Sequence, residues 1–171
     1  LYCLHLDEFD EPMDAVVYGV AASLGFAVYE NWEYVVSALN KDGYDHAVLV
    51  AVIRAISAVL LHALAGVMMG FFLIDAVFGK ENHKLNMVLA LLFPVCLHGF
   101  YNYILFTDDI SSWWAYALII IFLIRARFIF KNLQDSKITK HKKRMPQSSE
   151  IVFSILSTFG CVIFFYTIIN I

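Results

Sequence analysis

The chain has 171 residues, of which 61% are hydrophobic and 16% are charged, and its mean hydropathy is +0.71. Soluble domains carry roughly a quarter of charged residues, so this composition excludes a soluble globular domain and indicates an integral membrane protein. The net charge of −3 identifies no partner, because the distribution of Lys and Arg among the loops is what orients a membrane protein. The three cysteines, Cys3, Cys96 and Cys161, lie far apart without a CxxC pair and are interpreted as packing residues.

Five apolar segments follow one another along the chain, each about as long as the roughly 20 residues that a helix needs to cross a bilayer. The connectors between them are polar, and they leave no room for a separate soluble domain. The sequence therefore predicts an all-α fold, a polytopic transmembrane helix bundle that forms one domain over residues 1–171. Its expected spans are residues 13–39, 47–78, 85–106, 113–130 and 151–171.

The longest connector, residues 131–150, is strongly basic and sets the predicted topology. It carries six Lys and Arg residues against two acidic ones, and Arg125 and Arg127 lie just before it. The positive-inside rule places this connector in the cytoplasm and the C-terminus outside. Alternation along the chain then places the acidic N-terminal stretch LDEFDEP inside as well, without support from its own charges.

Glu30, His62 and His98 are ionisable residues on three successive expected spans. Counted from the cytoplasmic ends they lie roughly 17, 16 and 13 residues in, and each helical residue rises about 1.5 Å. They are therefore expected at similar depth, within about one helical turn of one another. A charged side chain at the bilayer centre costs at least ~2.5–3.5 kcal/mol on insertion scales, so such residues normally face the bundle interior and pair. The sequence predicts that the three side chains meet around one point.

Small residues accompany His62 along its helix. Ala58, Gly66 and Gly70 lie on the same face at four-residue spacing, a pattern that lets another helix backbone approach closely. His62 is therefore expected at a helix crossing.

A second polar pair lies on the third expected span. His98 and Asn102 are four residues apart and project to one side of the helix. Pro94, one turn earlier, removes a helical hydrogen bond and frees a carbonyl. The pair is thus expected at a bend, and Asn102 joins Glu30, His62 and His98 as a candidate site residue.

Each of these features also has a structural interpretation. On this interpretation a single transmembrane His is an interhelical hydrogen-bond donor without a chemical role, and the Gly66-xxx-Gly70 stripe is a packing feature. A buried Glu30 can be protonated and bond a neighbouring helix. Arg54 lies nearer the outer face, where its side chain can snorkel to the interface, which favours a structural role. The matched depth of three such residues on three helices favours a functional site.

Three stretches resemble, in order and spacing, the PrsW family of bacterial intramembrane proteases, relatives of the CAAX-processing and bacteriocin-immunity membrane endopeptidases. They are FDEPMDAVVYGVAASLGFAVYENWEYV, RAISAVLLHALAGVMMGFFL and LLFPVCLHGFYNY, and the match covers about residues 7–106. The family site is a polar cluster of Glu and His on neighbouring helices, described variously as metal-dependent or glutamate-based. The resemblance implies site roles for Glu30 and Asn31 in a Glu-Asn motif, for His62, and for His98 with Asn102 in a His-x-x-x-Asn motif.

The chain departs from the family pattern near its start. The family carries a Glu-Glu-x-x-Lys motif on a helix just before the Phe-Asp-Glu-Pro segment, whereas only eight residues precede Phe9 here and the chain contains no Glu-Glu pair. Because the chain opens on Leu1 without a recognisable signal peptide, we expect a truncated chain rather than a degenerate enzyme. On either account, we expect this polypeptide to be inactive by itself.

The activity that the resemblance implies is peptide-bond hydrolysis inside the bilayer. The implied substrate is a membrane-anchored regulatory protein such as an anti-sigma factor, in a bacterial plasma membrane and with no nucleic-acid partner. With a divalent metal such as zinc, His62 and His98 would be neutral imidazole ligands and a carboxylate would complete the set. Without a metal, the missing glutamate would be the base, and His98 and Asn102 would donate to the oxyanion. The sequence leaves both mechanisms open.

Two functions of other classes are also compatible with the sequence. A small transporter or ion-conducting bundle would use Glu30, His62 and His98 as a proton or cation relay. Internal repeats and broken helices are the transporter signature, and this chain has one proline-interrupted helix but no repeat. A non-catalytic membrane scaffold would keep the protease fold without turnover.

Overall fold

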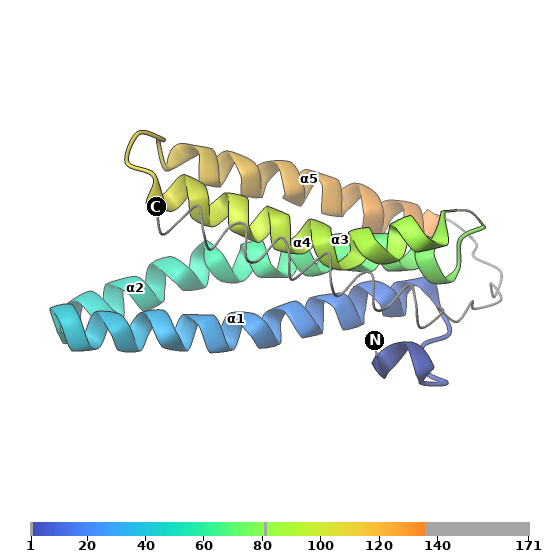
Figure 1. Cartoon of the computed structure of the whole chain (residues 1–171), viewed down its shortest axis with the longest axis horizontal. Coiled ribbons are helices and arrows are strands. Elements are labelled where there is room, and N and C mark those ends of the chain that lie inside the picture. The colour runs from blue at the N-terminus through green and yellow to red at the C-terminus, as the bar shows by residue number, and fades with distance from the viewer. Residues whose placement is uncertain (1, 81, 136–171) are drawn as a thin grey trace.

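The computed structural model describes residues 2–80 and 82–135, and every regular element within these residues is a helix. A short 3-10 helix, η1 (Tyr2–His5), precedes five α-helices, which run along the long axis of the bundle with α2 and α3 end to end (Figure 1). The predicted all-α fold is confirmed. The helices are α1 (Pro12–Asp42), α2 (Tyr44–Ile56), α3 (Ala58–Val77), α4 (His83–Phe106) and α5 (Trp113–Asp135).

Four helical stretches are long and apolar enough to cross a membrane, and they cover the first four expected spans. The last of them continues past the expected end at residue 130, because α5 runs on to Asp135. The fifth expected span, residues 151–171, lies outside the described residues, as does most of the basic connector. The four stretches are Pro12–Asp42, Tyr44–Val77, His83–Phe106 and Trp113–Leu133.

Local sequence chemistry fixes both ends of α1. Pro12 occupies the first turn, where its missing N–H is not needed, and Glu11 and Asp14 form a reciprocal capping box. At the other end the chain turns at Gly43, whose φ of 87° lies in the left-handed region that glycine adopts without strain. α1 and α2 therefore form a helical hairpin, which closes at one end of the bundle (Figure 1).

The second expected span is interrupted at Ser57, which separates α2 from α3. The Ser57 hydroxyl donates to the Ile53 carbonyl oxygen at 2.8 Å, a local bond of the kind that bends helices. The helical hydrogen-bond pattern resumes directly at Ser57, since the Leu61 N–H donates to the Ser57 carbonyl at 3.0 Å. The span is thus two helices joined end to end, where the apolar pattern predicted one.

α3 is the central helix of the bundle and packs against α1, α2, α4 and α5. More than half of its residues are buried, whereas Ala47 is the only buried residue of α2. The small-residue face predicted on α3 meets α1: Gly66 and Gly70 contact the α1 backbone around Val16, Gly19 and Val20. The expectation that this stripe admits a neighbouring helix is confirmed.

The outward surface of the bundle is largely apolar. Large side chains on α1, α2 and α5 are more than half exposed, which is what a lipid-facing surface requires. At the start of α5, Trp113 and Trp114 are 79% and 65% exposed, at the helix end where an interfacial anchor is expected.

At the N-terminal end of α1, Leu4 and Phe9 are buried against α3, so the acidic N-terminal stretch is held to the bundle by its apolar residues.

Candidate metal centre within the bundle

Glu30 of α1 lies at the centre of a polar cluster to which four helices contribute. Its Oε2 is 3.1 Å from His62 Nε2 on α3, and its Oε1 is 3.2 Å from His98 Nε2 on α4. The three side chains are 12%, 3% and 21% exposed, in the order Glu30, His62 and His98. The depth argument predicted that these three residues meet, and in the structure they do.

Close helix packing accounts for the position of His62. The Gly66 and Gly70 contacts hold α3 against α1, and the Ser23 hydroxyl of α1 donates to the His62 carbonyl oxygen at 2.7 Å. His62 therefore lies at a helix crossing, as its small neighbours predicted. Its ring faces the ring of His98, with centroids 4.7 Å apart.

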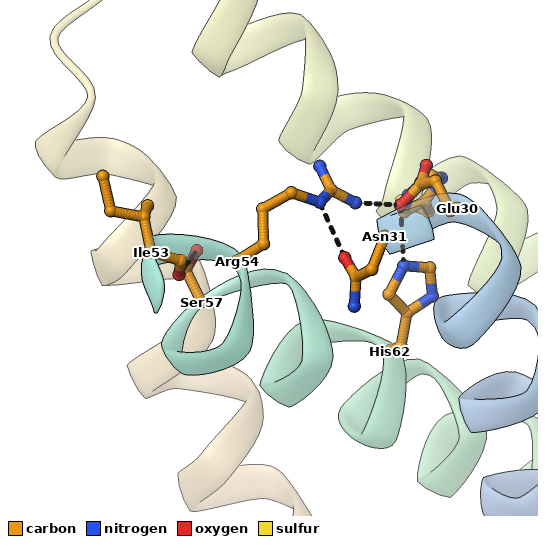
Figure 2. A network of polar contacts seen from close by, with 7 residues as sticks. Glu30, Asn31, Ile53, Arg54, Ser57 and His62 are labelled. Carbon is orange, nitrogen blue, oxygen red and sulfur yellow. Dashed lines mark hydrogen bonds and ion pairs between the residues drawn. The ribbon is translucent and has the colours of Figure 1, made fainter. Parts of the chain in front are cut away.

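Arg54 of α2 is also a member of the cluster, although the sequence analysis expected its side chain to snorkel to the interface. Its Nη2 is 2.5 Å from Glu30 Oε2, and its Nε donates to Asn31 Oδ1 at 2.6 Å, as Figure 2 shows. The guanidinium carbon also lies 3.8 Å from the centroid of the Tyr34 ring. The side chain is 14% exposed. The snorkelling expectation is wrong because the long side chain reaches a buried carboxylate instead of the interface.

The sequence contains a signal for the position of Arg54. The small-residue face of the second span runs through Ala58, His62, Gly66 and Gly70. One further step of four residues back from Ala58 gives Arg54. Arg54 thus shares the face that points at α1.

Phe26 is a second neighbour that the sequence analysis missed. It precedes Glu30 by four residues on α1, and its ring lies edge-on to both imidazoles, with centroid distances of 5.6 Å to His62 and 6.0 Å to His98. Phe26 itself is 53% exposed. An apolar ring therefore covers the histidine pair on its outer side.

Asn102 is the fourth candidate residue of the site and lies on α4. It is half-buried on α4, one turn beyond His98. In the part of the chain that the structure describes, no hydrogen bond links it to Glu30, His62 or His98. α4 continues through Pro94 as a single helix.

The composition and spacing of the cluster suit a metal ion. One ligand atom each of Glu30, His62 and His98 can be chosen so that all three lie within 4.8 Å of one another. Two imidazoles and one carboxylate are a known ligand set of catalytic zinc, in which a water molecule fills the fourth position. The residues present therefore fit a divalent metal such as zinc.

The fold and the site together define a class of protein: a polytopic helical membrane protein with a carboxylate and two imidazoles gathered inside the bundle. The particular family follows from comparison with known proteins. The family model for the PrsW family intramembrane metalloproteases matches residues 1–127, and the chain belongs to this family. The resemblance found in the three sequence stretches is thus confirmed.

Several curated relatives carry the name Protease PrsW. The protein of Bacillus subtilis (strain 168) is 40% identical over 111 residues, which cover 64% of this chain and 46% of the relative. That of Geobacillus kaustophilus (strain HTA426) is 34% identical over 119 residues, 64% of this chain and 49% of the relative. That of Clostridioides difficile (strain 630) is 29% identical over 150 residues, which cover 86% of this chain and 57% of the relative. The chain thus spans about half the length of these relatives. No solved structure matches it significantly.

Proposed function

We propose that this chain carries a metal-binding catalytic centre of an intramembrane protease that hydrolyses a peptide bond in a membrane-anchored protein. The observation that carries the proposal is the meeting of Glu30, His62 and His98, from three helices, inside an apolar bundle. Membership of a family described as metalloproteases supports the metal-dependent mechanism over the glutamate-based one.

Glu30, His62 and His98 are the proposed ligands of the metal, and zinc is the proposed ion. When bound, such an ion lowers the pKa of its water to about 7 and acts as a Lewis acid. The two imidazoles would hold it through Nε2, the nitrogen that each directs at the Glu30 carboxylate. His62 is almost fully buried, which fixes its ring, whereas His98 is more exposed and lies on the more accessible side of the site.

Two further residues contribute to the site in this proposal. Asn102 lies one turn from His98 on the same helix and holds no partner within the cluster, so its amide is available to donate to the developing oxyanion. Phe26 covers the imidazoles with an exposed ring and shields the reacting atoms from bulk water.

The proposed substrate is a membrane-anchored regulatory protein such as an anti-sigma factor, and the proposed location is the plasma membrane of a bacterial cell. Four apolar helices and a site among them support a substrate that is itself in the bilayer. The bacterial origin of the matching relatives supports the location.

The test is His98→Ala, with His83→Ala as the matched control. Both changes remove an imidazole from α4, but the His83 ring pairs with the Ala76 carbonyl, away from the site. Loss of a metal ligand or an oxyanion donor lowers the rate by at least about 10²–10³-fold. Loss of one interhelical hydrogen bond in a membrane protein costs only about 0.6 kcal/mol on average. We therefore expect His98→Ala to abolish cleavage and to leave thermal stability nearly unchanged.

The measurement is accumulation of uncleaved substrate in cells whose full-length gene carries either change, alongside thermal unfolding of the purified variants. The control variant His83→Ala is expected to cleave normally. If His98→Ala cleaves at a near wild-type rate, or fails to insert into the membrane, the histidine is structural and the protease proposal loses its main support.

A further inference from the structure

The Glu30 carboxylate is in contact with three side chains of the protein. Its Oε2 receives both the Arg54 guanidinium at 2.5 Å and His62 Nε2 at 3.1 Å, and its Oε1 receives His98 Nε2 at 3.2 Å. An ionised carboxylate has about four acceptor sites on its two oxygens. Three of these sites are taken, so a metal ion held by Glu30 together with His62 and His98 would lie beside the Arg54 guanidinium unless that group moves.

Charge identifies Arg54 as the donor that must leave. A guanidinium stays protonated in proteins, so it cannot give up its charge when a cation arrives. Arg54 and Glu30 are 14% and 12% exposed, and solvent ions screen such partly buried charges poorly. A divalent ion on Glu30 and a guanidinium on the same oxygen would repel each other strongly. His62 and His98, by contrast, can bind the ion through neutral nitrogens.

Arg54 makes two contacts in addition to the one with Glu30. Its Nε is held by Asn31 Oδ1 at 2.6 Å, and its guanidinium lies over the Tyr34 ring at 3.8 Å. Asn31 and Tyr34 follow Glu30 on α1, so both contacts lie on the side of the carboxylate that faces the α1–α2 turn. The guanidinium can give up Glu30 and keep these two contacts.

The backbone that carries Arg54 is also able to adjust. Arg54 lies three residues before Ser57, where the span is interrupted, and α2 buries only Ala47. His62 lies beyond the interruption on the well-packed α3. A small shift of α2 therefore moves Arg54 while His62 stays in place.

We propose that Arg54 is a positioning residue that competes with the metal ion for the Glu30 carboxylate. It holds the carboxylate between His62 and His98, and it withdraws toward Asn31 and Tyr34 when a divalent cation binds. The inference rests on the metal centre of the proposed function, and it adds that this chain sets its own metal affinity below that of the bare ligand set.

The experiment measures the affinity of the purified chain, in detergent micelles, for Zn²⁺ in competition with a fluorescent chelator. We expect Arg54→Gln to bind Zn²⁺ at least tenfold more tightly than the wild type and Arg54→Lys, which keeps the charge, to stay within about threefold. His62→Ala is expected to bind at least tenfold more weakly. Arg125→Gln is the matched control, because it removes a guanidinium that lies over Phe71 on another helix pair, and no change is expected.

A residue that merely stabilised the bundle would leave the affinity unchanged or lower it when replaced. Unchanged or weaker binding by Arg54→Gln therefore overturns the inference, as does a Lys variant that binds as tightly as the Gln variant. If Zn²⁺ binding depends on His62 but not on Arg54, this inference alone fails. If neither the wild type nor Arg54→Gln binds Zn²⁺ through His62, the proposed metal centre fails with it.

A measurement on the wild-type chain covers the case in which Arg54→Gln does not fold. The Nη–H signal of Arg54, from the group that contacts Glu30, is observed by NMR in chain labelled with ¹⁵N-arginine and assigned by its absence from Arg54→Lys. Its shift on titration with Zn²⁺ supports the withdrawal of the guanidinium. A signal that stays in place while His62 binds Zn²⁺ overturns it.

Discussion

Replacement of Gly66 by Ala tests whether the contact between α1 and α3 positions the site. A Cβ at this position would lie 2.6 Å from the Val20 Cα and 2.7 Å from the Gly19 carbonyl oxygen. Both are backbone atoms, so no side chain can turn aside to make room. Ordinary contact needs about 3.4 Å or more, so the helices must part locally by about 0.8 Å.

The expected loss of stability follows from this overlap. Overpacking of a tight contact typically costs about 1–3 kcal/mol. In a chain of this size that corresponds to a fall in Tm of about 2–12 °C. The same displacement would stretch the 3.1 Å contact between Glu30 Oε2 and His62 Nε2 past the hydrogen-bond limit of about 3.5 Å. Gly66→Ala is therefore also expected to bind Zn²⁺ more weakly than the wild type.

Gly25→Ala is the matched control for Gly66→Ala. A Cβ on Gly25 would meet nothing within 4 Å, and alanine is the better helix former. This variant is expected to unfold at the wild-type temperature or slightly above it. Both variants are followed by thermal unfolding in detergent with tryptophan fluorescence. Equal Tm values for Gly66→Ala and Gly25→Ala would refute the claim that the backbone contact determines the packing of α1 on α3.

Two further predictions concern the helix crossing and the topology. Ser23→Ala removes the 2.7 Å hydrogen bond to the His62 carbonyl, and this loss is expected to cost only about 0.6 kcal/mol of stability. A fall in Tm as large as that of Gly66→Ala would contradict the expectation that the backbone contact matters more than this bond. The basic connector 131–150 is predicted to be cytoplasmic, so Ser148→Cys, in a chain whose three native cysteines are replaced, should resist an impermeant thiol reagent in intact cells. Labelling of this cysteine from outside would show that the chain has the opposite orientation in the membrane.

The residues of the centre could be predicted from the sequence because depth in a membrane helix is a matter of counting. A helix rises about 1.5 Å per residue, so Glu30, His62 and His98 could be placed at one level without any knowledge of side-chain contacts. Hydrocarbon surroundings then favour pairing among them. The small-residue spacing of Gly66 and Gly70 predicted the crossing with α1 for a similar reason, since only small side chains admit a second backbone.

Side-chain direction was the part that the sequence did not determine. Arg54 has a side chain long enough to reach either the interface or a carboxylate on the neighbouring helix, and both choices satisfy its charge. The interruption at Ser57 was also unforeseen, because an unbroken apolar run carries no sign of a local hydroxyl-to-carbonyl bond. Asn102 shares a helix face with His98, yet spacing alone did not show that its amide stands outside the hydrogen bonds of the cluster.

The distribution of the partners of Glu30 over three other helices has a consequence for biosynthesis. During synthesis from the N-terminus, α1 leaves the ribosome before Arg54, His62 and His98 exist, and a lone carboxylate in lipid costs at least ~2.5–3.5 kcal/mol on insertion scales. The first partner made is Arg54, on the helix that forms a hairpin with α1. His62 and then His98 follow in chain order. α1 and α2 thus carry Glu30 into the bilayer as an ion pair with Arg54, on which the later helices assemble.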